Sequence, residues 1–113
     1  MSWASVSNLR TGRTLHNFAR VCFSDEDRAW GLLRSRADES VLIPGCKQIH
    51  TVGMRFFIDV LFLDDHGTVL ECLTVSPGKQ AMCPGADCVL EVPEGTIEAS
   101  QTEVGDRLEL AYF

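Results

Sequence analysis

Short apolar runs separated by turn residues dominate this chain, and several of them alternate apolar and polar positions as β-strands do. Gly12 and the run Asp64-Asp-His-Gly67 predict hairpin loops, and Pro44-Gly45 stops a strand. Residues 93–100 predict a loop with one helical turn. Strands are predicted at residues 4–9, 14–21, 41–43, 49–54, 56–63, 68–75, 89–92 and 107–113, those at 49–54 and 56–63 being two strands or one strand bent at Gly53.

One segment, residues 24–34, predicts a helix instead. Ser24 suits the N-cap position and Asp27 suits the capping-box position. The acidic residues there also complement the positive end of the helix dipole. One helix among many strands predicts a mainly β fold (α+β by count), a small antiparallel β-sandwich or barrel with one short helix covering an opening.

Asp59 lies inside the most hydrophobic run of the chain, the predicted strand from Phe56 to Leu63. A strand this apolar is expected to be covered on both faces, where an isolated carboxylate is too costly to bury. Arg55 lies about 13 Å away along a regular strand that rises about 3.3 Å per residue. We therefore expect Asp59 to meet Arg28 of the helix or backbone amides of a neighbouring strand. It either ties the helix to the sheet or lines a pocket as an acid or base.

Composition and charge narrow the class of protein. A chain of 113 residues predicts one domain over residues 1–113. Sixteen acidic against ten basic residues give a formal charge of −6, which argues against nucleic acid as a partner. No apolar run reaches the roughly 18 residues of a transmembrane helix, and the N-terminus lacks a secretory pattern. Five cysteines without a CxxC pair suit a reducing compartment. We expect a cytoplasmic protein without membrane insertion.

Polar side chains beside the apolar strands form a candidate binding pocket. His50 and Arg55 flank the central apolar run, and Glu91 interrupts a short apolar strand. The Glu91 carboxylate is expected to point either to solvent or into the same pocket as His50. The predicted pocket residues are His50, Met54, Arg55, Asp59, Glu91 and Arg28.

Cysteine and histidine positions leave two further alternatives open. Cys46 and His50 are four residues apart, and Cys83 with Cys88 would complete a tetrahedral metal set, although structural zinc sites bring ligands as tighter pairs. Alternatively, Cys46 and His50 would act as nucleophile and base in a hydrolase-like enzyme. Buried thiols and a hydrogen-bonded histidine are commoner than either, so no cofactor is predicted.

Several motifs follow one another in a fixed order from about Asn8 to Leu110. They are Arg28-x-x-Gly31-Leu32-Leu33, Ile49-His-Thr-Val-Gly53-Met54-Arg55, Ile58-Asp59-Val60-Leu61-Phe62-Leu63-Asp64, Gly67-x-Val69, Ala86-x-x-Val89-Leu90-Glu91-Val92, Gly95 and Gly105-Asp106. Together they resemble the bacterial and archaeal family called domain of unknown function 192 (DUF192). The apolar-Asp-apolar strand with its preceding Met and following Asp turn is the most specific part.

The resemblance implies a small β-rich barrel or sandwich and no established activity, substrate or cofactor. It also implies a connection with pilus or secretion machinery, beside which similar members are often encoded. Two stretches depart from the family pattern. Gly31-Leu-Leu-Arg-Ser-Arg36 replaces Gly-Leu-Met-Phe-Arg or Gly-Leu-Leu-Gly-Arg, and His50-Thr-Val-Gly-Met-Arg55 replaces Trp-Met-Lys-Asn-Thr. A site built on the usual residues is therefore not carried over, and His50 would belong to a subgroup.

These observations favour a non-catalytic module that binds a small ligand or a protein partner in the mouth of a β-barrel. The alternative is a Cys46–His50 enzyme or a metal-binding protein, and a purely structural or assembly role is the third class. The ligand, the partner and the oligomeric state do not follow from the sequence.

Overall fold

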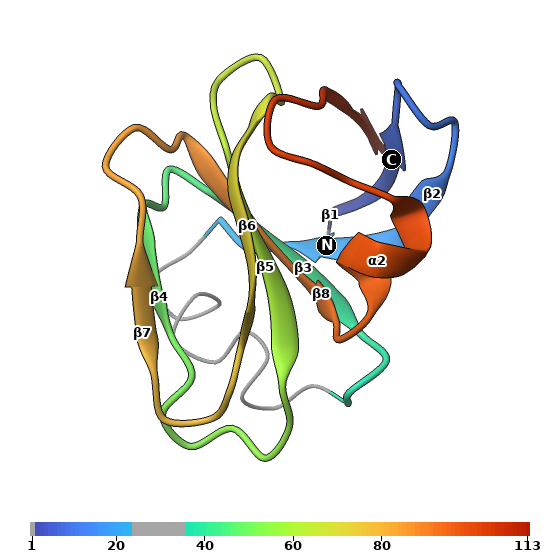
Figure 1. The fold of residues 1–113 in the computed structure, drawn as a ribbon. Coiled ribbons are helices and arrows are strands. Elements are labelled where there is room, and N and C mark those ends of the chain that lie inside the picture. Colours follow the sequence, from blue (N-terminus) through green and yellow to red (C-terminus); the bar gives the residue numbers. More distant parts are fainter. Residues whose placement is uncertain (1, 24–35) are drawn as a thin grey trace.

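The computed structural model describes residues 2–23 and 36–113, and its strands confirm the mainly β prediction. The helix predicted at residues 24–34, with Arg28, lies outside the described residues. The described elements, drawn in Figure 1, are β1 (Ser2–Asn8), β2 (Thr14–Val21), β3 (Ser40–Pro44), β4 (Gln48–His50), β5 (Ile58–Leu63), β6 (Val69–Val75), β7 (Gln80–Met82), β8 (Cys88–Pro93), α2 (Thr96–Ser100) and β9 (Leu108–Tyr112).

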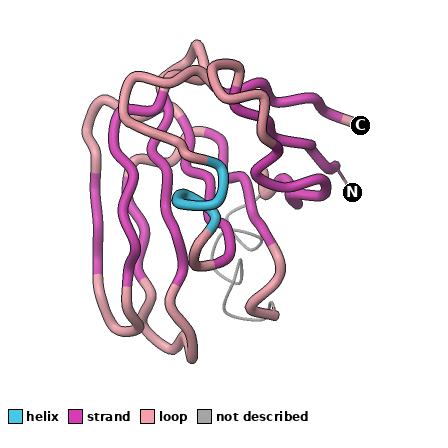
Figure 2. The backbone as a smooth tube through the Cα atoms, turned by 45° about the vertical axis from the view of Figure 1, so that its right-hand side comes forward, coloured by secondary structure: helices cyan, strands magenta, loops and turns pink. Residues whose placement is uncertain are grey.

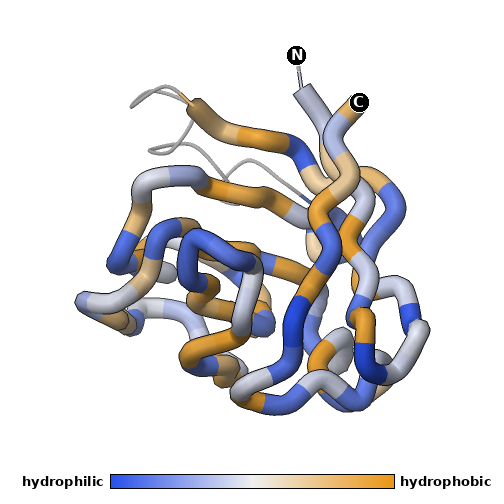
Figure 3. Tube along the Cα trace, turned by 90° about the horizontal axis from the view of Figure 1, so that it is seen from above, coloured by the Kyte–Doolittle hydropathy of each residue, from blue (hydrophilic) through white to orange (hydrophobic). Residues whose placement is uncertain are grey.

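Seven of these strands form one curled sheet in the order β6-β5-β8-β3-β2-β1-β9. Its described pairs are antiparallel except β2 with β3, which run parallel. This parallel pair is an exception within the antiparallel fold that the sequence predicted. The first and last strands pair with each other, so both chain ends lie side by side, as Figure 3 shows.

Strand β5 is buried on both faces of the sheet, as its apolar sequence predicted. Every residue of β5 is buried, with Leu61 and Leu63 in one apolar cluster and Val60 and Phe62 in another. Side chains alternate between the two faces of a strand, so one continuous apolar run serves both clusters. Ile97 of α2 packs on the first cluster, and Figure 2 shows the short helix lying against the strands.

A separate two-stranded ribbon, β4 with β7, covers part of the second cluster. Its register pairs Gln48 with Met82 and His50 with Gln80. Strand β4 is shorter than the predicted strand at residues 49–54, because the chain turns at Gly53, where φ is 89°. Strand β7 was not predicted, since three residues between two turns carry too little pattern to reveal a strand.

The helical turn expected in residues 93–100 is the helix α2. It begins after Gly95, whose φ of 93° is one that glycine adopts without strain. Within the described part of the chain, no helix is long and apolar enough to cross a membrane.

Candidate functional site

Asp59 is buried, and each of its carboxylate oxygens accepts hydrogen bonds. The hydroxyl of Thr74, directly opposite on β6, donates to Oδ1 at 2.7 Å. The backbone amides of Gly95 and Ile97, at the start of α2, donate to Oδ2 at 3.2 and 2.9 Å. Three donors stabilise a carboxylate that would otherwise be too costly to bury. Asp59 therefore ties β5 to β6 and to α2.

Asp59 is thus held by backbone amides and a hydroxyl, and the alternative partner, Arg28, lies outside the described residues. The amides come from a helix start that lies 36 and 38 residues away along the chain. No sequence pattern reports such a contact, because it depends on how the helix is placed across the sheet.

Glu91 is buried in the middle of β8, with only 6% of its surface exposed. It lies opposite Val41 on one neighbouring strand and opposite Val60 on the other. No hydrogen bond or ion pair to Glu91 occurs among the residues that the structure describes. Burial raises the pKa of its carboxyl from 4.5 to about 7. The expectation that Glu91 points to solvent is wrong.

A hollow of about 380 Å³ lies on the β4–β7 ribbon. His50 belongs to its lining, together with exposed residues of the same ribbon face. Polar groups from Gln48 and Gln80 and the thioether of Met82 give it both hydrogen-bonding and apolar surface. The lining residues are Gln48, Ile49, His50, Gln80, Ala81 and Met82.

The structure does not gather the other predicted pocket residues around this hollow. Met54 is buried in the second apolar cluster, and Arg55 is exposed in the turn before β5. Neither of them, nor Asp59 or Glu91, belongs to the hollow's lining. Of the predicted set, His50 alone does so among the described residues.

The cysteines do not assemble with His50 into a site. Among the described residues, no three metal-ligating side chains converge. The thiol of Cys46 donates to the carbonyl of Gln48 at 2.9 Å. Burial raises the pKa of the Cys83 thiol and raises that of Cys88 to about 11. These two thiols therefore stay protonated near neutral pH, and a protonated thiol is a poor nucleophile.

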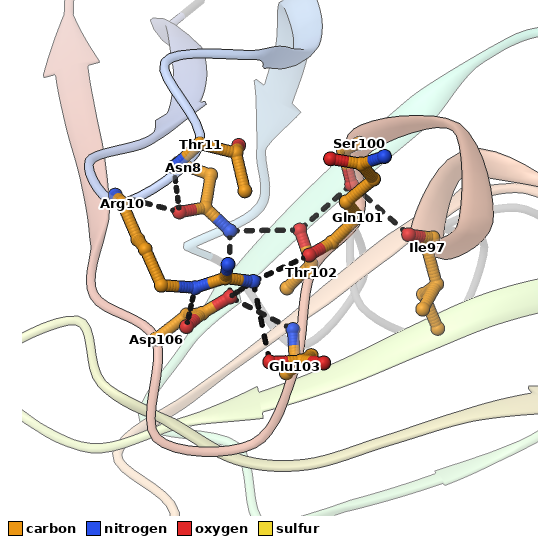
Figure 4. Close-up of polar contacts among 9 residues, drawn as sticks. All are labelled: Asn8, Arg10, Thr11, Ile97, Ser100, Gln101, Thr102, Glu103 and Asp106. Atoms are coloured by element: carbon orange, nitrogen blue, oxygen red, sulfur yellow. Dashed lines mark hydrogen bonds and ion pairs between the residues drawn. The ribbon is translucent and has the colours of Figure 1, made fainter.

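A polar network, shown in Figure 4, joins the turn after β1 to the segment before β9. Arg10 donates to both oxygens of Asp106, at 2.6 and 2.9 Å. The amide group of Asn8 donates to Asp106 and to Thr102, at 3.0 and 3.1 Å. The backbone N–H of Glu103 donates to Asp106 at 2.8 Å. Hydrogen bonding to Arg10 holds the pKa of Asp106 well below its usual range.

Sequence reasoning recorded Asp106 only as part of a Gly-Asp motif and did not predict this network. Its partners lie 96 and 98 positions away along the chain. The carboxylate is saturated with donors, so it stabilises the junction between the turn after β1 and the segment before β9.

Fold and motifs together define a class of small proteins built on a curled β-sheet. Residues 7–110 match the family described as Uncharacterized ACR, domain of unknown function 192. The chain belongs to this family, as the motif resemblance predicted.

A relative and two solved structures are similar to the chain. A UPF0127 protein of Pyrococcus furiosus is 39% identical over 62 residues. That match covers 54% of this chain and 53% of the relative, so the chain spans about half the length of the curated relative it matches. A putative transcription regulator from Sinorhizobium meliloti has a TM-score of 0.81 at 21% identity, covering 97% of this chain and 94% of that one. A protein of unknown function from Novosphingobium aromaticivorans has a TM-score of 0.76 at 17% identity, covering 95% and 83%. At these identities the two structures show the shared fold alone.

Proposed function

We propose that this protein is a non-catalytic binding module whose ligand occupies the hollow on the β4–β7 ribbon. The observation that carries the proposal is the hollow itself, about 380 Å³ with a mixed polar and apolar lining. Binding sites for small ligands commonly measure about 300–1,000 Å³ and combine apolar walls with a few polar groups.

The hydrogen bonds of two buried carboxylates, Asp59 and Asp106, support the ribbon as the site. Asp59 already accepts three hydrogen bonds from the protein, and Asp106 is saturated by Arg10 and its neighbours. A ligand would have to displace those bonds to reach either group. His50 and Gln80, by contrast, are exposed, and no hydrogen bond to either side chain occurs among the described residues.

A binding role also suits the chemistry of the thiols better than a catalytic one. A Cys–His enzyme needs an activated thiolate beside its base. Here Cys46 donates to a backbone carbonyl, and no hydrogen bond between its thiol and His50 occurs among the described residues. A connection with pilus or secretion machinery stays a prediction from the family resemblance.

The proposal is tested by adding mixtures of small fragments to ¹⁵N-labelled protein and following the amide resonances. We expect shifts centred on the two ribbon segments, 48–50 and 80–82. His50→Ala should weaken those shifts, while His66→Ala, which changes an exposed histidine in the loop between β5 and β6, should leave them unchanged. Shifts that cluster elsewhere, or ribbon amides that no fragment moves, would refute the proposal.

A further inference from the structure

The charge around the ribbon differs from that of the rest of the chain. Residues 44–57 and 76–86, which contain both ribbon strands and the turns beside them, include no aspartate or glutamate. They hold three basic residues, Lys47, Arg55 and Lys79, and also His50. All sixteen acidic residues of this chain lie elsewhere. A basic surface on an otherwise acidic protein attracts negatively charged ligands and repels positively charged ones.

The hydrogen bonds of the ribbon show which backbone groups point outward. The N–H of Cys83 donates to the carbonyl of Lys47 at 2.8 Å, just beyond the paired strands. In an antiparallel ladder, bonded pairs alternate with non-bonded pairs. Met82, opposite Gln48, is therefore in a non-bonded pair, and so is Gln80 two residues earlier. Their N–H and C=O groups point away from β4, along the outer edge of β7.

This edge is open in the described part of the chain. Among residues 2–23 and 36–113, β7 pairs with β4 and with no second strand. No hydrogen bond within those residues occupies the outward groups of Gln80 or Met82. Figure 1 shows the ribbon at the left margin of the molecule, with β7 outermost. Such an edge is a template for an added strand.

We propose that the ribbon binds an acidic peptide segment, which adds to β7 as a further antiparallel or parallel strand. This inference rests on the proposed function and names its ligand class. Main-chain hydrogen bonds to Gln80 and Met82 give affinity, and every second side chain of the peptide lies on the ribbon face that carries the hollow, next to the side chains of Gln80 and Met82. The basic surroundings select acidic residues at those positions.

The two ends of the ribbon differ in charge, and this difference determines which end the acidic side chains of the peptide approach. Lys79 is exposed beside Gln80, at the end where His50 lies. At the opposite end, Glu71 of β6 lies beside the Cys83 thiol. The ammonium of Lys47 is held by the carbonyls of Pro84 and Ala86, at 3.0 and 2.8 Å. The acidic side chains of the peptide therefore lie towards Lys79.

The test uses two pools of short acetylated and amidated peptides, in which glutamate or lysine alternates with a mixture of Ser, Val, Leu and Tyr. Each pool, and citrate as a small polyanion, is added to the ¹⁵N-labelled protein. We expect the glutamate pool to shift the amides of Gln80 and Met82, and to bind at least about tenfold more tightly than the lysine pool.

Two pairs of variants separate charge from strand addition. Lys79→Glu should weaken binding of the glutamate pool, whereas Arg13→Glu, the same charge change on the exposed turn after β1, should not. Met82→Pro removes an outward N–H without breaking a bond to β4, so it should abolish peptide binding. Met82→Leu keeps that N–H and should retain binding.

Each other outcome overturns the inference. Equal binding of both pools would remove the acidic preference. Citrate binding as tightly as the glutamate pool, with no effect of Met82→Pro, would make the ribbon a site for free anions. Fragments that shift the ribbon while neither peptide pool does would leave the proposed function standing and refute the peptide ligand.

Discussion

The buried carboxyl of Glu91 predicts a specific dependence of stability on pH. Burial raises its pKa from 4.5 to about 7, so the folded state favours the protonated form more than the unfolded chain does. As pH rises through this window, the folded protein holds the proton that the unfolded chain releases. The free energy of unfolding therefore falls between pH 4.5 and about 7 and levels off above it.

The size of the effect follows from the shift. One pKa unit corresponds to about 1.4 kcal/mol, so the ionised carboxylate costs about 3 kcal/mol above neutral pH. Glu91→Gln keeps the shape of the side chain and removes its charge. We expect the variant and the natural protein to be similarly stable near pH 4, with the variant becoming about 3 kcal/mol more stable near pH 8.

Urea unfolding, followed by tryptophan fluorescence at several pH values, measures this difference. Subtracting the natural protein's curve from that of the variant removes the contribution of other titrating groups. Glu94→Gln, an exposed glutamate just beyond β8, is the matched control and should show no such pH-dependent gain. A difference between Glu91→Gln and the natural protein that stays constant from acid to mildly alkaline pH would refute the reasoning.

Three further predictions concern groups that the fold holds in place. Asp59→Asn leaves a buried donor where an acceptor is needed, so it should lower the free energy of unfolding by about 3 kcal/mol in urea titrations. The control Asp65→Asn, in an exposed loop, should lower it by less than about 0.5 kcal/mol. Equal losses in the two variants would contradict this prediction. Asp106→Asn should lower the free energy of unfolding by about 2 kcal/mol near neutral pH. Because Arg10 lowers the pKa of the Asp106 carboxyl, the difference in stability between the natural protein and the variant should shrink as pH falls below about 4. A difference that does not depend on pH would exclude the ion pair as its cause. Iodoacetamide should alkylate partly exposed Cys46 at least about tenfold faster than Cys88, as read by mass spectrometry of peptides, and similar rates would show that Cys88 is not buried.

Exposed polar residues of this protein are of two kinds: some have side chains that are available to a ligand, and others have side chains that are hydrogen-bonded within the protein. His50 and Gln80 lie in a hollow and leave their side chains available to a ligand. Arg10, although half-exposed, is committed to Asp106 and to the carbonyl of Gln101. Exposure alone therefore does not identify a site, and the hydrogen bonds of each group must be counted first.

Local patterning was sufficient to predict most of the strands, although not β7, and the burial of β5. Alternating positions and apolar runs indicate which residues are buried, and turn residues indicate where the chain reverses. The β-rich fold and the family could therefore be predicted from the sequence. The same reasoning showed that Asp59 must be paired, because the cost of burying a lone carboxylate does not depend on its partner.

The tertiary structure alone determined which residues distant in the chain are in contact. The amides that hold Asp59, the arginine that holds Asp106 and the parallel pairing of β2 with β3 all join residues distant in the chain. Strand β7 is a strand because β4 lies beside it, and the hollow with His50 exists because these two short segments meet. Local preferences constrain each segment separately, whereas such contacts are chosen by packing of the whole chain, which no short stretch of sequence encodes.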